Sequence, residues 1–194
     1  MLQKRFLKNN FINMSKEQFY AKKPLEMVKD AEGLITPFGT LYCADRRFLT
    51  FELAFFYYFI YDYKIFNQLD HETRIRIFNT FLGEIQLSRP DDFPDLKSIN
   101  KFYEVRIFTY FKIAQEITTM GEFSEKCANY INTLLTYSEE NNVFTCYNLD
   151  QAEKELKPNI EPNKYTDELK TLLMLSSSPI MIHGIDPTER HKEI

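Results

Sequence analysis

The chain contains no tryptophan, only five glycines and only three cysteines among its 194 residues. Scarce glycine, together with many Lys, Glu, Leu and Ile residues, favours long helices over a turn-rich β fold. Cys43, Cys127 and Cys146 are widely spaced and form no Cys-x-x-Cys pair. An odd number of scattered cysteines is typical of reduced thiols, so we expect an intracellular, cytoplasmic protein.

Sequence templates for catalysis and metal binding are also missing. The chain has no glycine-rich phosphate loop, no Gly-x-Ser-x-Gly elbow and no Glu-x-x-His pair. His71, His183 and His191 stand apart from one another, and no Glu-x-x-His pattern includes any of them. The sequence therefore favours a non-catalytic protein without metal or cofactor.

No apolar run is long enough to span a bilayer, which requires about 20 mostly apolar residues. The most hydrophobic stretch, residues 51–66, has nine Phe or Tyr among sixteen residues, and its uninterrupted apolar part is only Leu53–Tyr61. Wound as a helix, this stretch points apolar side chains in every direction and must be covered on all sides. We predict a central helix surrounded by other helices.

The remaining sequence predicts those surrounding helices. Apolar residues recur at helical spacing in three later segments, namely residues 70–85, 96–119 and 123–138. A last helix is expected after Thr166, and a helix broken at Pro24 is expected before Gly33. Short connections between long helices predict antiparallel neighbours. The fold class expected is therefore an all-α antiparallel bundle of about five to seven helices. Residues 34–43, with a turn at Pro37–Gly39, fit either a minor hairpin or a looped strap.

Helix ends are signalled by individual side chains. Ser15 with Gln18 forms a capping box, with Met14 and Phe19 placed as a hydrophobic staple. Asp70 and Thr166 are the N-caps expected for two later helices. A further helix is expected to stop at residues 141–142, where two asparagines follow one another.

Domain organisation is predicted to be simple. Residues 1–176 form one helical domain, and residues 177–194 form a C-terminal tail that is flexible or strapped over the body. Residues 1–14 form a basic amphipathic arm, in which one face would carry Leu2, Phe6, Leu7 and Phe11. Such an arm can contact a membrane surface, but packing against the body of the protein is the favoured interpretation.

Net charge is −4, and it is divided unevenly along the chain. Residues 1–50 carry nine Lys/Arg and five Asp/Glu, whereas residues 51–194 carry fifteen and twenty-three. This balance argues against nucleic-acid binding by the whole surface. It suits a basic protein as the partner.

Arg106 is the most informative single residue, because it lies within the apolar stripe of the 96–119 segment. A buried guanidinium must be paired, since an unpaired buried charge is very costly. Glu52, Asp62 and Glu84 are the carboxylates that neighbouring helices could offer. We predict a structural pair with one of them, or a guanidinium that reaches the bundle edge.

A second interpretation of Arg106 is functional. With Tyr103 or Tyr110 it would hold an anionic ligand group in a pocket. Glu52 and Asp62 on the central helix are the remaining candidates. These five residues are the candidate ligand- or partner-binding residues.

The function predicted from the sequence is a non-catalytic intracellular protein-interaction module, of the inhibitor, immunity or regulatory type. The alternative is a small-molecule binding protein or enzyme with an aromatic pocket near Arg106. The sequence predicts neither the oligomeric state nor the identity of a partner.

Overall fold

The computed structural model describes residues 15–65, 68–88, 91, 96–117, 119–142 and 164–183. These residues form six α-helices and one 3-10 helix: α2 (Lys16–Leu34), η1 (Thr40–Cys43), α3 (Arg46–Ile65), α4 (His71–Ser88), α5 (Leu96–Glu116), α6 (Met120–Asn141) and α8 (Thr166–His183). The described part of the chain contains no β-strand. The prediction of an all-α helical bundle is confirmed.

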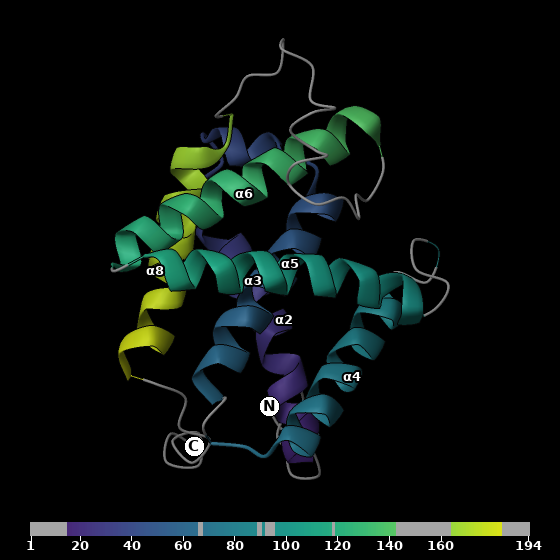
Figure 1. The fold of residues 1–194 in the computed structure, drawn as a ribbon. Helices are drawn as coiled ribbons and strands as arrows, with labels where there is room; N and C mark the ends of the chain where they lie inside the picture. Colours follow the sequence, from purple (N-terminus) through teal and green to yellow (C-terminus); the bar gives the residue numbers. More distant parts are fainter. Residues whose placement is uncertain are drawn as a thin grey trace, which may run out of the picture.

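Helix α3 is the centre of the bundle, as the sequence predicted for residues 51–66. It packs against α2, α5, α6 and α8, while α4 packs against α2 and α5. Figure 1 shows α5 crossing in front of α3, with α6 above it and α4 at its lower right. Every residue of α3 from Phe51 to Tyr61 is buried. None of the described helices combines the length and apolar character that a bilayer span requires.

Aromatic rings join the central helix to its neighbours. Phe51 meets Phe102 of α5 edge to face at a centroid distance of 5.4 Å. Tyr58 stacks on Phe81 of α4 at 4.4 Å. These arrangements are the ones that aromatic quadrupoles favour. The excess of Phe and Tyr in the sequence is therefore used largely for packing around α3.

The predicted helix starts at Ser15 and Asp70 are confirmed. Ser15 accepts a hydrogen bond from the backbone N–H of Gln18 at 3.2 Å, and its own N–H donates to the Gln18 side chain at 3.1 Å. Asp70 accepts from the backbone N–H of Thr73 at 2.8 Å. Asn142 ends α6 in the left-handed region, with φ of 50°. Met14, the other half of the expected staple, lies outside the described residues.

The expected interruption at Pro24 is wrong, because α2 runs through this residue without a break. Proline in a helix interior removes one backbone hydrogen bond and costs about 3 kcal/mol. Pro24 is buried, and α2 packs along both α3 and α4. Tertiary packing therefore offsets the local preference.

The minor hairpin considered for residues 34–43 is also wrong. Residues 36–39 do form a turn, in which the N–H of Gly39 donates to the carbonyl of Thr36 at 3.2 Å. The chain then enters the 3-10 helix η1 instead of a second strand. Strand pairing would leave an isolated hairpin, which is marginal by itself.

Helix α8 differs from its prediction at both ends. It begins at Thr166, but the carbonyl of Tyr165 accepts the first helical hydrogen bond, from Leu169 at 2.9 Å, so Thr166 is not the N-cap. The preceding backbone is fixed by Asn132, whose side chain accepts from the N–H of Tyr165 at 2.9 Å.

Residues 177–183, assigned to the tail by the sequence, continue α8 to His183. The hydroxyls of Ser176 and Ser177 donate hydrogen bonds to the carbonyls four residues earlier. These polar side chains therefore find hydrogen-bond acceptors within the helix itself. The arm at residues 1–14 and the remainder of the tail, residues 184–194, lie outside the described residues.

Candidate functional site

Arg106 of α5 is fully buried, and it forms an ion pair with Glu52 of α3. Its Nε donates to Glu52 Oε2 at 3.0 Å, and its Nη2 donates to Oε1 at 2.6 Å. Glu52 is 2% exposed and Arg106 is 0% exposed. Two parallel charge-assisted hydrogen bonds satisfy both charges away from water. The buried pair predicted from the apolar stripe is therefore present.

The pair changes the protonation equilibria around it. Burial by itself lowers the pKa of Arg106, but the charge and hydrogen bonds of Glu52 outweigh burial, so this pKa is raised. The pKa of Tyr110 is raised well above its ordinary value by burial and by the negative charge of Glu52. Burial also raises the pKa of Tyr130. Arg106 therefore stays charged, and Tyr110 and Tyr130 stay neutral, at physiological pH.

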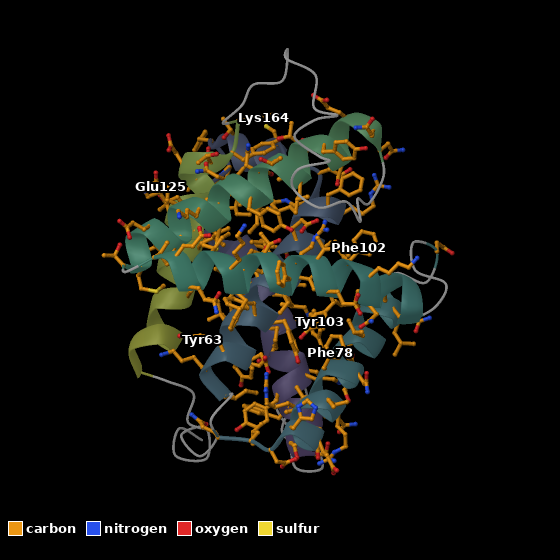
Figure 2. The ribbon with its side chains drawn as sticks, viewed as in Figure 1. Tyr63, Phe78, Phe102, Tyr103, Glu125 and Lys164 are labelled. Atoms are coloured by element: carbon orange, nitrogen blue, oxygen red, sulfur yellow. The ribbon has the colours of Figure 1, made fainter. Side chains whose placement is uncertain are left out.

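The other two candidate residues lie apart from this pair. Asp62 binds Arg74 of α4, with Nε and Nη2 donating at 2.9 and 2.6 Å. Tyr103 packs on Phe78 at a ring centroid distance of 3.9 Å. Figure 2 shows Phe102 and Tyr103 on opposite sides of α5, with Tyr103 directed toward α4. The five candidate residues thus form two separate groups and not one pocket.

The geometry of the buried pair supports a structural role. The guanidinium of Arg106 already holds a carboxylate in its two-pronged donor edge. An anionic ligand that displaced Glu52 would leave that carboxylate buried without its partner, which is strongly unfavourable. Among the described residues, no group of three or more His, Cys, Asp or Glu side chains is placed to hold a metal ion.

A different feature lies at the surface, in the loop between α2 and α3. Phe38 stands at the tip of this loop and is 100% exposed. Three residues later, Leu41 is only 1% exposed and inserts into the core. A large apolar side chain is therefore held in water by a segment that is itself anchored in the protein.

Glu168 in the first turn of α8 fixes this loop. Its Oε1 accepts from the backbone N–H and the hydroxyl of Thr40 at 2.5 and 2.7 Å, and its Oε2 accepts from the N–H of Leu41 at 3.0 Å. The Thr40 hydroxyl also lies 3.0 Å from the carbonyl of Lys164. Burial favours the neutral acid, but these hydrogen bonds outweigh burial and lower the pKa of Glu168.

Gly39 leaves room for this contact. A methyl group at position 39 would lie within 3 Å of the Glu168 carboxylate, at 2.2 Å from its Oε2. The backbone φ of Gly39 is −89°, which any residue can adopt. A side chain here would push the Glu168 carboxylate away from its contacts, so close approach favours glycine and backbone conformation does not require it.

Glu139 of α6 anchors the end of the same segment. Its carboxylate accepts from the backbone N–H of Asp45 at 2.7 Å and from the Tyr165 hydroxyl at 2.9 Å. Lys164 lies 3.6 Å from the same carboxylate. Residues 36–45 are therefore tied to α6 and α8 by two carboxylates. We call this segment, with Phe38 at its tip, the clamped loop.

Sequence reasoning found the turn of the clamped loop but not its anchors. Proline before Phe38 and glycine after it predicted the turn. An acid in the first turn of a helix complements the dipole of that helix, and the position of Glu168 in the sequence indicates only that role. Its contact with Thr40 spans 128 residues. No local pattern in a single sequence could have revealed it.

Comparisons with known proteins identify no relative: no family model, curated protein or solved structure matches this chain.

Proposed function

We propose that this protein is a non-catalytic protein-interaction module and that it binds its partner through the clamped loop. The observation that carries the proposal is the full exposure of Phe38 on a loop held by Glu168. Aromatic residues are strongly enriched among those that dominate binding energies. A loop that is already ordered loses less conformational entropy on binding, and this improves affinity.

The surroundings of Phe38 suit a protein partner. Leu34 at the end of α2 is 50% exposed, and Tyr42 in η1 is 51% exposed. Aromatic side chains such as Phe and Tyr are enriched in interfaces between proteins.

A basic protein is the proposed partner, and the cytoplasm is the proposed compartment. The net charge of −4, concentrated as −8 in residues 51–194, would attract a basic surface over long range. An inhibitory, immunity or regulatory binding protein would need no catalytic group of its own. The ligand-binding alternative near Arg106 has weaker support, because Glu52 occupies the guanidinium.

Site-specific photo-crosslinking in the native host tests this proposal. A photoreactive phenylalanine analogue would replace Phe38 in one sample and Leu87 in another. Leu87 on α4 is a matched control, since it is apolar and 80% exposed. We expect one protein to be crosslinked from position 38 and not from position 87.

Binding of the recovered protein would then be measured with purified components. We expect Phe38→Ser to raise the Kd about tenfold or more, as for an interface hot spot. Leu87→Ser should leave it unchanged. The proposal fails if position 38 gives no adduct, or if Phe38→Ser and Leu87→Ser bind alike.

A further inference from the structure

The outer face of α5 carries an apolar side chain between two opposite charges. Glu104, Phe108 and Lys112 follow one another at intervals of four residues, and all three are exposed. Residues four apart in an α-helix differ by about 40° around the axis, so the three side chains share one face. Phe108 is 71% exposed, and the adjacent Phe111 is 47% exposed. In Figure 1, no other described helix lies in front of α5.

The order of these residues makes the face complementary to itself. If a second α5 is laid antiparallel with Phe108 opposite Phe108, Glu104 of each copy faces Lys112 of the other. The same operation brings Val105 of one copy level with Phe111 of the other, on opposite flanks of the contact, and Val105 is half-buried. The charges therefore match, and Phe108 meets Phe108, under a single two-fold axis.

We propose that α5 pairs with α5 of a second copy of this chain, forming a two-fold symmetric dimer centred on Phe108. Symmetric dimers are the commonest oligomers, and each uses the same patch on both subunits. Rows of side chains spaced by four are also the rows that interdigitate in the commonest class of helix crossing, near −50°. This contact shares no residue with the clamped loop, so the two proposals can fail separately.

The side chains concerned are available for such pairing. Within its own chain, Glu104 accepts a hydrogen bond from the amide of Asn100 at 2.9 Å, an exposed contact that leaves the other carboxylate oxygen accessible. Lys112 lies about two turns further along the same face and is also exposed. A contact based on one helix is smaller than the standard interface of about 1,600 Å². We therefore expect a weak dimer, with a Kd on the order of 10–100 μM, roughly −7 to −5.5 kcal/mol.

Sedimentation equilibrium of the full-length protein over a range of concentrations tests the dimer. Glu104→Lys alone would place lysine opposite lysine at both ends of the contact, and Lys112→Glu alone would place acid opposite acid. We expect each single variant to raise the dimer Kd about tenfold or more. Lys29→Glu on α2 changes charge by the same amount at another exposed site and should leave the Kd unchanged.

The symmetry allows two rescue experiments. Each restores the dimer only if Glu104 faces Lys112 of the other copy. The double variant Glu104→Lys/Lys112→Glu exchanges the charges and should restore the dimer. Mixing the two single variants should give a heterodimer, because every like-charge contact becomes an opposite-charge contact. Phe108→Ser should abolish pairing while the circular dichroism spectrum stays helical. A wild-type protein that remains monomeric at millimolar concentration, or single variants that dimerise like wild type, would overturn the proposal.

Discussion

At the scale of single residues, the central helix contains two acids with different environments. Both Glu52 and Asp62 interrupt the aromatic stretch, and both bind an arginine through two hydrogen bonds. The side chains of the Glu52–Arg106 pair are 3% and 0% exposed, whereas those of Asp62–Arg74 are 17% and 19% exposed. Residual hydration stabilises the charges of the second pair. The first pair is shielded from water, and its guanidinium also lies 5.3 Å from the centroid of the Phe102 ring.

We predict that breaking the buried pair strongly destabilises the protein. Arg106→Met would leave the Glu52 carboxylate buried without a counter-charge, and such changes cost about 3–5 kcal/mol. The double variant Glu52→Met/Arg106→Met removes both charges and should recover most of this loss. Urea unfolding followed by circular dichroism gives the free energies of unfolding.

The partly hydrated pair supplies the control for this cycle. Asp62→Asn should cost clearly less than Arg106→Met, since water reaches Arg74. If Arg106→Met were no more destabilising than Asp62→Asn, the buried pair would not have the structural role assigned to it.

At the scale of elements, local signals fixed several helix ends, and distant contacts fixed the loop before α3. Ser15, Asp70 and Asn142 act within their own turns, so the sequence could reveal them. Residues 36–45 instead take their shape from Glu168 and Glu139. The turn before Gly39 is local, but the 3-10 helix that follows depends on an anchor from α8.

We predict that the clamped loop loosens in acid. The pKa of Glu168 is lowered on folding, so its stabilising contribution is complete above the ordinary glutamate pKa of about 4.3. The contribution is lost as the pH falls through the lower, folded-state pKa. The amide resonances of Thr40 and Leu41 should therefore shift in NMR spectra as the pH falls below the ordinary glutamate pKa.

Two variants identify the group responsible. Glu168→Gln should remove the titration of both amides and leave the loop less ordered at neutral pH. Asp167→Asn alters the neighbouring, exposed acid and should leave the titration in place. Persistence of the titration in Glu168→Gln would assign it to another carboxylate and contradict the clamp.

At the scale of the whole molecule, one core links all the described helices. Cys127 of α6 is fully buried in this core, whereas Cys43 of η1 is exposed. Burial also raises the pKa of the Cys127 thiol well above its ordinary value, so the reactive thiolate is scarce. Access to Cys127 requires the helices around α3 to separate.

We predict that Cys127 reacts only when the whole domain unfolds. In a Cys43→Ala/Cys146→Ala variant, thiol labelling should be very slow in water and should accelerate with urea. Its urea dependence should match that of global unfolding measured by circular dichroism, as for a cooperative single domain. Fast labelling with a shallow urea dependence would instead show that α6 opens independently of the rest.

The sequence by itself determined the class of the fold and its centre. Scarce glycine, helical periodicity and the apolar stretch at residues 51–66 predicted a helical bundle around that stretch, because burial of an all-round hydrophobic helix has few solutions. An arginine within an apolar stripe likewise predicted a buried carboxylate partner. These inferences depend on local spacing and on desolvation, which a sequence records directly.

Only the tertiary structure decided which distant residues meet. Of the three carboxylates considered for Arg106, Glu52 binds it and Asp62 and Glu84 do not, because α5 packs on α3 beside Glu52. The tertiary structure carried α2 through Pro24, since packing against two helices outweighs a local penalty. It also placed Glu168 against Thr40 and left Phe38 in water. Such outcomes depend on how helices cross, and crossing geometry is a property of the assembled core.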